Sequence, residues 1–229
     1  MKKSQGSGRY DSIPRGRGQG KKFKKNFNSS TASMRKRLIQ LILARSFKFT
    51  KKPSFTLASG KKSNFYFNCK PTTLNSEGKY LIGNLLYEII NKWKPGRIKA
   101  VGGLTLGADP VANAIAYTAH LKGKNMEAFV VRKAAKKHGT MQWIEGHLKK
   151  GDRVIIVEDV ITTGGSSIEA IKKAGECGLK VAGVLVLIDR QEGGREAIEA
   201  LGIPVITLLT KEEIFKAYKN NKKCLSRYL

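Results

Sequence analysis

One stretch decides the fold: Val154-Ile155-Ile156-Val157-Glu158-Asp159-Val160-Ile161-Thr162-Thr163-Gly164-Gly165-Ser166. Its apolar start predicts a strand over residues 153–157, because short apolar runs are typical of strands covered on both faces. Two carboxylates follow, then a turn of threonines and glycines, and then the start of a helix over residues 166–177. We therefore expect a strand, a tight turn and a helix, with polar groups gathered at the turn.

The turn is suited to binding a phosphate. Its glycines let the backbone approach a ligand closely, and the first N–H groups of the helix form an anion site at the positive end of the helix dipole. Thr162, Thr163 and Ser166 add hydroxyl donors, while Glu158 and Asp159 can hold hydroxyl groups directly or through a hydrated metal ion. A ligand with a phosphate beside a diol fits these groups, and ribose 5-phosphate has this arrangement. The alternative is an ordinary polar cap, but two acids so close to an apolar strand need another reason.

The remaining chain alternates strands and helices. We expect helices from Arg35 to about Arg45 and over residues 78–93, 110–120, 166–177, 195–201 and 211–219. We expect strands over residues 98–102, 127–131, 153–157, 181–188 and 204–208. Such alternation is typical of a central parallel sheet flanked by helices, in which ligands bind at the carboxyl ends of the strands. The fold class is therefore α/β, in one domain over residues 34–229.

Residues 1–33 differ from the rest of the chain. They contain nine Lys or Arg and one acid, a net charge of +8 within the +27 of the whole chain. Such a segment buries too little apolar surface to offset its ordering entropy, so we expect a disordered basic tail. Arg15-Gly16-Arg17-Gly18 resembles a short RNA-binding stretch, which suggests weak RNA binding. The alternatives are a solvated tail, a transit peptide, or a true start at Met34.

Bulk composition excludes several classes. No run reaches the roughly 18 apolar residues of a membrane span, and the basic start lacks the apolar stretch of a secretory signal. Cys69, Cys177 and Cys224 show neither metal-ligand spacing nor a disulfide pattern, so we expect reduced thiols in a cytoplasmic protein. The net charge indicates either nucleic-acid binding or a basic proteome background together with a site for polyanionic small molecules, and charge alone does not choose between them.

A second informative segment is Arg132-Lys133-Ala134-Ala135-Lys136-Lys137-His138-Gly139-Thr140. It has no apolar helical face, so we expect a loop over about residues 132–141. Its cations can neutralise a pyrophosphate as it leaves a reacting centre. Taken alone, such a run is more often a solvated charged surface.

Two further features can form a pocket for a flat ring. Phe65-Tyr66-Phe67 can stack on a planar base or pack in the core as part of a strand. Arg190 follows an apolar run over residues 184–188, and its planar guanidinium suits a carboxylate or a ring carbonyl. The alternative for Arg190 is a surface ion pair with Asp189.

The stretch over residues 154–166 resembles the thirteen-residue phosphoribosyl pyrophosphate (PRPP) motif of the type I phosphoribosyltransferases. The resemblance implies that family's fold, a parallel sheet with a small N-terminal hood, here over about residues 35–75. It implies that residues 162–166 hold the 5-phosphate and that the two acids lie by the ribose hydroxyls and Mg²⁺, which is held mainly through the substrate. The implied PRPP-binding residues of this motif are Glu158, Asp159, Val160, Ile161, Thr162, Thr163, Gly164, Gly165 and Ser166.

The basic segment resembles the catalytic loop of orotate phosphoribosyltransferases, with its pattern Arg-Lys-x-x-Lys-x-His-Gly. In that family the loop is mobile, closes over the site and reaches across a homodimer interface. The implied PRPP-binding residues are Arg132, Lys133, Lys136 and His138. The implied catalytic residues are Lys136, Arg132, His138 and Asp159.

Residues 55–68 resemble the hood that lines the orotate pocket in the same family. The implied orotate contacts are Thr162, Arg190, Tyr66 and Phe67. The sequence departs from the family pattern at two places. Ala58 stands where some members carry a lysine, and Thr105 or Leu106 stands where another version carries one in its pyrophosphate loop. These departures indicate a sub-branch of the family.

Together the resemblances imply transfer of the phosphoribosyl group from PRPP to orotate, giving orotidine 5'-monophosphate and pyrophosphate in pyrimidine (UMP) biosynthesis. Orotate is already an anion, so we expect no strong general base. One alternative is a transferase for another base. A second is a PRPP-sensing regulator that binds nucleic acid through the tail, although the intact loop pattern favours the enzyme. A chain of 229 residues leaves no room for a decarboxylase domain, so a separate protein would supply that step.

Overall fold

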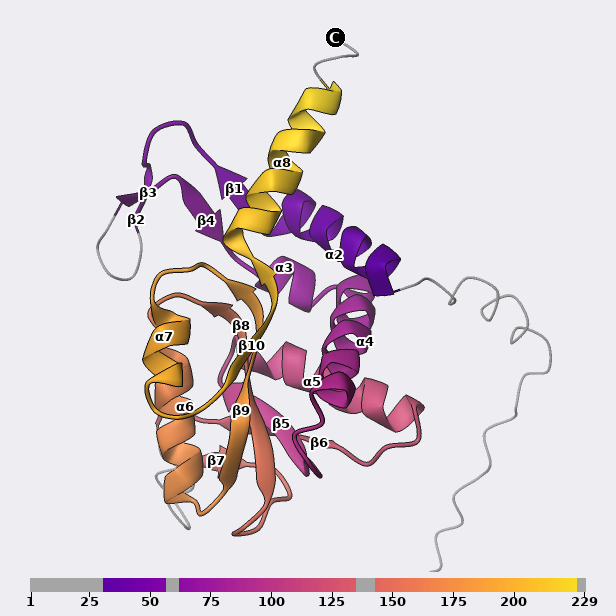
Figure 1. The fold of residues 1–229 in the computed structure, drawn as a ribbon, viewed down its shortest axis with the longest axis vertical. Helices are drawn as coiled ribbons and strands as arrows, with labels where there is room; N and C mark the ends of the chain where they lie inside the picture. Colours follow the sequence, from indigo (N-terminus) through magenta and orange to yellow (C-terminus); the bar gives the residue numbers. More distant parts are fainter. Residues whose placement is uncertain (1–30, 57–61, 135–142, 226–229) are drawn as a thin grey trace, which may run out of the picture.

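The computed structural model describes residues 31–56, 62–134 and 143–225, which Figure 1 shows as a coloured ribbon. A six-stranded sheet forms the centre, in the order β10-β9-β8-β5-β6-β7. Its strands are β5 (Ala100–Leu104), β6 (Glu127–Val131), β7 (Ile144–Glu145), β8 (Arg153–Ile161), β9 (Lys180–Asp189) and β10 (Val205–Thr210). All neighbours pair in parallel except β7, which is antiparallel to β6. The predicted α/β class is therefore confirmed, with one short antiparallel edge strand added.

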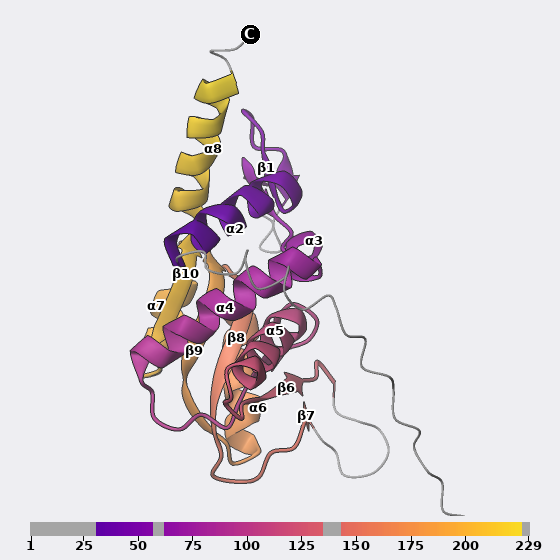
Figure 2. The ribbon, with the colours of Figure 1, turned by 90° about the vertical axis from the view of Figure 1, so that its right-hand side faces the viewer.

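Helices cover both faces of this sheet. One face carries α4 (Ser76–Trp93) and α5 (Ala108–Leu121), and the other carries α6 (Gly165–Glu176) and α7 (Gly194–Glu199). Figure 2, turned from Figure 1, shows α4 and α5 toward the viewer with the strands behind them. Along β8, Ile155 and Val157 join the core beneath α4 and α5, whereas Val154 and Ile156 join the core beneath α6. Because successive side chains of a strand point to opposite faces, the continuous apolar run fills both cores.

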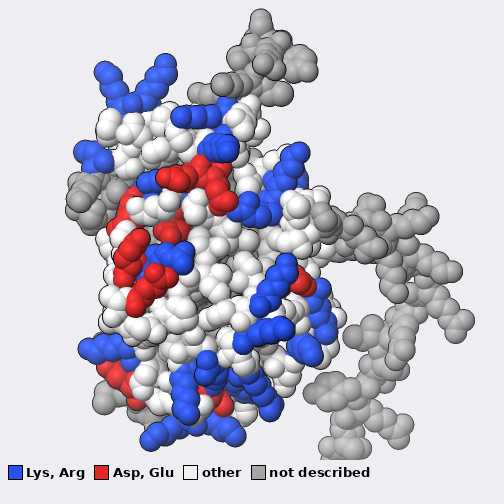
Figure 3. All heavy atoms as spheres, in the orientation of Figure 1, with Lys and Arg blue, Asp and Glu red and all other residues white. Residues whose placement is uncertain are grey.

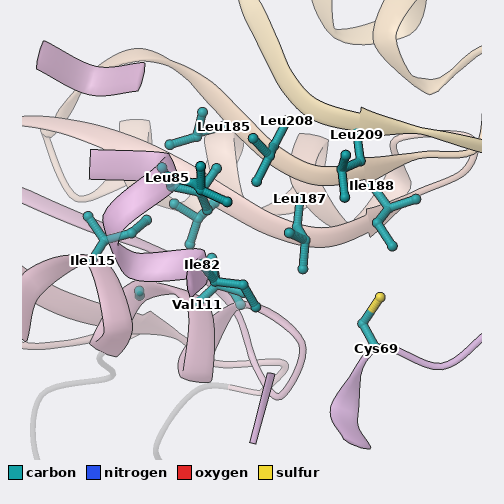
Figure 4. Close-up of a cluster of buried hydrophobic side chains, with 14 of the residues drawn as sticks. Cys69, Ile82, Leu85, Val111, Ile115, Leu185, Leu187, Ile188, Leu208 and Leu209 are labelled. Carbon is teal, nitrogen blue, oxygen red and sulfur yellow. The ribbon is translucent and has the colours of Figure 1, made fainter. Parts of the chain in front are cut away.

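The core between α4, α5 and the sheet is shown in Figure 4. Ile82 and Leu85 of α4 and Ile115 of α5 meet Leu185 and Leu187 of β9, and these five side chains are 0–1 % exposed. Burying one such side chain contributes about 1.5–3 kcal/mol relative to leaving it in water. The spacing of apolar residues along α4 and α5 thus determines which face of each helix packs against the strands.

A small N-terminal hood stands above the carboxyl end of the sheet (Figure 1). Its elements are α2 (Thr31–Arg45), β1 (Phe47–Phe49), β2 (Phe55–Thr56), β3 (Lys62–Ser63), β4 (Phe65–Phe67) and α3 (Lys70–Thr73). The last helix, α8 (Lys211–Leu225), returns to pack against it. The rings of Phe49 and Phe65 lie 5.1 and 4.9 Å from the ring of Phe215. Aromatic contacts therefore join the first and last parts of the folded chain.

Several element boundaries differ from the predictions, and two of the differences change which residues belong to the site or to the tail. β8 continues to Ile161 because its pairing with β9 continues past residue 157, so Glu158 and Asp159 lie inside the strand. α2 begins at Thr31, so the last three residues of the predicted tail belong to a helix. The rest of the tail, residues 1–30, lies outside the described residues. β4 confirms the alternative that Phe65-Tyr66-Phe67 is part of a strand. The strands β1, β2, β3 and β7 were not predicted, because two or three residues are too few to show a periodic pattern.

In the part of the chain that the structure describes, no helix is both long enough and apolar enough to cross a membrane. Cys69 is buried and Cys177 is exposed, and both are free thiols. The cysteine pattern in the sequence predicted this state for both residues.

Candidate active site

The centre of the candidate site is the acid pair at the end of β8. Glu158 is 7 % exposed, and its Oε2 accepts a hydrogen bond of 3.0 Å from Ser167 Oγ. Burial, followed by the charge of Asp159, raises the pKa of Glu158 to about 8. Burial also raises the pKa of Asp159, although the backbone N–H of Val160 donates to its Oδ1 at 3.0 Å. Two adjacent carboxyls with raised pKa values are suited to a cation or to hydroxyl groups, which would stabilise their ionised forms.

The predicted phosphate turn follows directly. Gly164 has φ +84°, a left-handed conformation that glycine adopts without a steric penalty, and α6 begins at Gly165. A β-carbon at Gly164 would also lie 2.8 Å from the backbone oxygen of Gly194. No side chain of a described residue caps α6, and its first turn contains no acid. The N–H groups at this helix end can therefore receive a phosphate, with the half-buried Thr162 and the exposed Thr163 beside them.

A second glycine-rich turn lies against the acid pair. It joins β5 to α5, and a β-carbon added at Gly107 would overlap Asp159 Oδ1. Within this turn the Thr105 hydroxyl donates to Asp109 Oδ2 at 2.7 Å, and the side chain of Leu106 is 68 % exposed. The predicted pyrophosphate loop and the predicted sugar-phosphate motif therefore lie next to each other, as expected for the ends of the neighbouring strands β5 and β8.

Arg190 is buried beside the hood. It is 5 % exposed, and its guanidinium carbon lies 6.0 Å from the centroid of the Phe67 ring. Its Nη2 lies 2.9 Å from Glu192 Oε1, while its Nε has no hydrogen-bond partner among the described residues. Asp189 instead accepts the backbone N–H of Gln191 at 2.7 Å, so the alternative of a surface pair between Arg190 and Asp189 is wrong. A buried guanidinium with an unused donor can bind an anionic planar ligand.

Tyr66 does not share the position of Phe67. Tyr66 is 40 % exposed and stacks on Phe55, with ring centroids 5.4 Å apart and an interplanar angle of 26°. Neighbouring residues of a strand point to opposite faces, so Phe67 turns toward Arg190 while Tyr66 turns away from it. The structure thus brings together Phe67 and Arg190 from the predicted base pocket and leaves Tyr66 on the other side of β4.

Only the first three residues of the predicted basic loop, 132–134, are described. Arg132 follows β6, and its Nη1 lies 3.0 Å from Glu145 Oε1 on β7. Lys133 is exposed, whereas Lys136 and His138 lie outside the described residues. The backbone N–H of Arg132 donates to the carbonyl of Trp143 at 2.8 Å. The two sides of the loop are therefore paired where they leave the sheet.

Two residues near the acid pair were missed in the sequence. Ser167, which donates to Glu158, lies one position beyond the recognised motif. Lys70 begins α3, and its positive charge lowers the pKa of Asp159, against the larger effect of burial. Lys70 also lines a cavity of about 250 Å³ with Leu106 and Asp109. No local signal in the sequence places Lys70 here, because the hood reaches the site only through the tertiary fold.

The acid pair could hold a divalent cation only together with a ligand. Among the described residues, no group of three or more His, Cys, Asp or Glu side chains is arranged to bind a metal ion. Glu158 and Asp159 supply the carboxylate oxygens that Mg²⁺ prefers, and Mg²⁺ is commonly bound by one or two carboxylates plus substrate phosphates. The site therefore fits an ion that arrives with a phosphorylated substrate.

Comparison with known proteins identifies the family. The family described as "Phosphoribosyl transferase domain" matches residues 73–207, which include both glycine-rich turns and the acid pair. The orotate phosphoribosyltransferase of Aquifex aeolicus (strain VF5) is 47 % identical over 180 residues, which cover 79 % of this chain and 97 % of that protein. The chain belongs to the orotate phosphoribosyltransferase family.

Solved structures of orotate phosphoribosyltransferases agree with this assignment. The enzyme of Mycobacterium tuberculosis H37Rv in complex with Fe(III) dicitrate has a TM-score of 0.69 and 39 % identity, covering 79 % of this chain and 98 % of that one. The same enzyme in complex with PRPP has a TM-score of 0.63 and 35 % identity, covering 79 % and 91 %. These matches confirm the predicted fold and family, and with them the prediction that the chain is an enzyme.

Proposed function

We propose that this orotate phosphoribosyltransferase family member transfers the phosphoribosyl group from PRPP to orotate, giving orotidine 5'-monophosphate and pyrophosphate in UMP biosynthesis. The observation that carries the proposal is the position of Arg190. Its side chain lies by Phe67, and its backbone N–H donates to the carbonyl of Ile161 at 3.0 Å, at the start of the phosphate turn. The proposed pocket for an anionic ring therefore adjoins the proposed binding site for the sugar phosphate.

The phosphate turn would fix the sugar. The free N–H groups at the start of α6 and the hydroxyls of Thr162, Thr163 and Ser166 would hold the 5-phosphate. Val160 and Ile161, at the end of β8, would lie beneath the ribose. This arrangement positions one end of PRPP, and positioning contributes much of the rate in such a transfer.

The acid pair would stabilise the sugar as its bond to pyrophosphate breaks. Glu158 and Asp159 would lie by the ribose hydroxyls, and their negative charge would favour a positively charged sugar in the transition state. Mg²⁺ would be held by these carboxylates and by the substrate, and when bound it would neutralise the charge of the pyrophosphate. Because both pKa values are raised in the free protein, arrival of the cation would favour loss of the proton from the pair.

The base pocket would recognise orotate by its charge and its planarity. The Arg190 guanidinium would pair with the carboxylate or a ring carbonyl, and the ring of Phe67 would form one wall. Thr162 would contact orotate from the phosphate turn. Tyr66 remains a predicted contact of orotate. Because it lies on the opposite face of β4, we expect its replacement to affect orotate binding less than replacement of Phe67.

The basic loop would stabilise the departing pyrophosphate. Arg132, Lys133, Lys136 and His138 are its proposed contacts, and Lys136 is proposed as the main catalytic cation. Closing a mobile loop over residues 132–141 would exclude water, which could otherwise attack the activated sugar.

We propose a homodimer formed through α4 and α5. Tyr117 and Leu121 on α5 are 66 and 67 % exposed, and a cavity of about 410 Å³ lies between α5 and α4 around Tyr117. Leu106, in the second glycine-rich turn, and Leu74, after α3, are exposed on the same side of the molecule. Such a patch of apolar residues is typical of an interface. A partner bound here would lie next to the active site, as a loop shared between subunits requires.

We propose that the basic tail binds RNA weakly. We also propose that the protein is cytoplasmic and that its thiols are reduced. Lys and Arg side chains are also spread over the folded part and gather at the lower end of the face in Figure 3. Deleting residues 1–30 should abolish a salt-dependent shift in the mobility of RNA if the tail carries this binding. An unchanged shift would assign it to the folded part instead.

The proposed reaction is tested by following the loss of orotate absorbance with PRPP and Mg²⁺, beside parallel assays with uracil, adenine and xanthine. Consumption of orotate alone supports the proposal, whereas preference for another base supports the alternative transferase. Lys136→Ala should lower kcat at least tenfold with a smaller change in the KM of PRPP. Absence of any transfer with all four bases would favour the regulator.

The proposed dimer is tested by sedimentation of the parent protein and of Tyr117→Glu. A charge at the centre of an apolar interface should convert a dimer into a monomer. A parent protein that sediments as a monomer would contradict this part of the proposal.

A further inference from the structure

Lys173 is a buried lysine that the proposed mechanism does not use. It lies on α6, the helix that begins at the phosphate turn, and it is 7 % exposed. Its Nζ donates to the carbonyl of Arg132 at 2.9 Å and to Glu169 Oε1 at 2.6 Å. The same Nζ lies 4.0 Å from the centroid of the Trp143 ring. All the bonding capacity of the ammonium group is therefore directed to three specific neighbours.

Two of these neighbours lie at the base of the basic loop. Arg132 ends the β6 side, Trp143 starts the β7 side, and the N–H of Arg132 donates to the carbonyl of Trp143. Lys173 contacts both of them from α6. It thus connects the strand pair that carries the loop to the helix whose first residues form the phosphate turn.

General stability does not account for a lysine at this position. Removing an ammonium group from water carries a large free-energy cost, and buried ion pairs can often be replaced by apolar residues without loss of stability. Leucine or methionine would fill the same space beside Trp143. What an apolar residue cannot do is bind the Arg132 carbonyl and so fix where the Arg132 side chain leaves the sheet.

We infer that Lys173 is a positioning residue that holds Arg132 in register with the phosphate turn. The inference rests on the proposed function, because Lys173 acts through a proposed contact of the pyrophosphate. A misplacement of about 1 Å near a reacting centre costs up to about a hundredfold in rate. Loss of Lys173 should therefore lower turnover although Lys173 itself touches no substrate.

The test is a double-mutant cycle between Lys173→Met and Arg132→Ala. Lys173→Met alone should lower kcat for orotate transfer roughly tenfold or more and change the KM of orotate little. In the Arg132→Ala background, Lys173→Met should change kcat less than about twofold, because the residue that it positions is already absent. Lys172→Met is the matched control, since Lys172 is the exposed neighbour on the same helix and should leave turnover unchanged.

Two results would overturn the inference. One is an unchanged kcat in Lys173→Met. The other is an equal loss of kcat with and without Arg132, which is the behaviour of a residue that only stabilises the fold. Thermal denaturation of each variant checks folding. If Lys173→Met does not fold, Lys173→Leu replaces it in the same cycle, because leucine likewise cannot donate to the Arg132 carbonyl.

A second readout separates this inference from the proposed function. In a Trp93→Phe background, the fluorescence of Trp143 should change when PRPP is added, and Lys173→Met should abolish that change. This measurement needs no orotate chemistry. If the parent protein binds PRPP but transfers it to no base, the proposed function fails, while an unchanged fluorescence response in Lys173→Met would still refute the role of Lys173.

Discussion

The guanidinium carbon of Arg190 lies 6.0 Å from the centroid of the Phe67 ring, although one residue follows β9 and the other belongs to the hood. Arg190 is 5 % exposed and Phe67 is 8 % exposed. The Arg190 guanidinium, at the carboxyl end of the central sheet, and the Phe67 ring, from the hood, therefore lie together in a buried position. The proposed base pocket is therefore formed by two segments that lie far apart in the sequence.

Arg190→Ala should weaken orotate recognition more than PRPP binding. Hydrogen bonds to charged groups are worth about 1.5–3 kcal/mol, so kcat/KM for orotate should fall roughly 10- to 100-fold. Arg190→Lys should not restore it, because an ammonium group lacks the planar fork of a guanidinium. Steady-state kinetics with each substrate varied in turn measures this, with Arg195→Ala as the control on the exposed surface of α7. An equal loss of kcat/KM for orotate and for PRPP would show that Arg190 does not contact orotate specifically.

Phe67→Leu and Tyr66→Leu should differ, although the two residues are neighbours. Phe67 faces Arg190, so its replacement should raise the KM of orotate several-fold. Tyr66 is 40 % exposed and stacks on Phe55, so its replacement should change this KM less. The opposite order of effects would show that the hood presents its other face to the base.

Gly107→Ala should abolish most activity while leaving the fold intact. The added methyl group would overlap Asp159 Oδ1 and displace that carboxylate from its place in the site. Gly107 has φ −64°, so backbone strain does not contribute. We expect kcat/KM for PRPP to fall at least tenfold. Gly175→Ala is the control, because a β-carbon there meets nothing within 4 Å, and it should keep full activity.

Glu158 should make the free protein less stable as pH rises from about 5 to 8. Its pKa is raised from 4.5 to about 8, chiefly by burial, so across this window the folded state keeps a proton that the unfolded chain has lost. Stability falls with pH wherever the folded state binds more protons, by at most about 1.4 kcal/mol per pH unit for one group. Thermal denaturation of Glu158→Gln should therefore show a flatter dependence on pH than the parent.

The control for this pH dependence is Glu199→Gln, which removes an exposed acid paired with Arg195 and should leave the slope unchanged. A parent protein whose slope equals that of Glu158→Gln would show that Glu158 ionises normally.

Local patterns predicted the strands and helices that carry the site. The run over residues 154–166 combines an apolar strand, two acids and a glycine turn within one segment, and all of these are recognisable without knowing any neighbour. Sequence patterns did not predict the features that depend on the pairing of neighbouring strands. β8 runs four residues further than its apolar run because β9 continues beside it, and β7 exists because it pairs with β6.

By itself, the sequence determined the α/β class, the family and the strand, turn and helix start over residues 154–166, because each depends on residues close together in the chain. The tertiary structure alone decided which residues meet across the chain: Arg190 with Phe67, Gly107 with Asp159, and Lys173 with Arg132 and Trp143. The physical reason is that such contacts depend on the order of strands in the sheet and on how the hood packs above it. Spacing within a segment does not encode that order, whereas burial of both faces of the sheet enforces it.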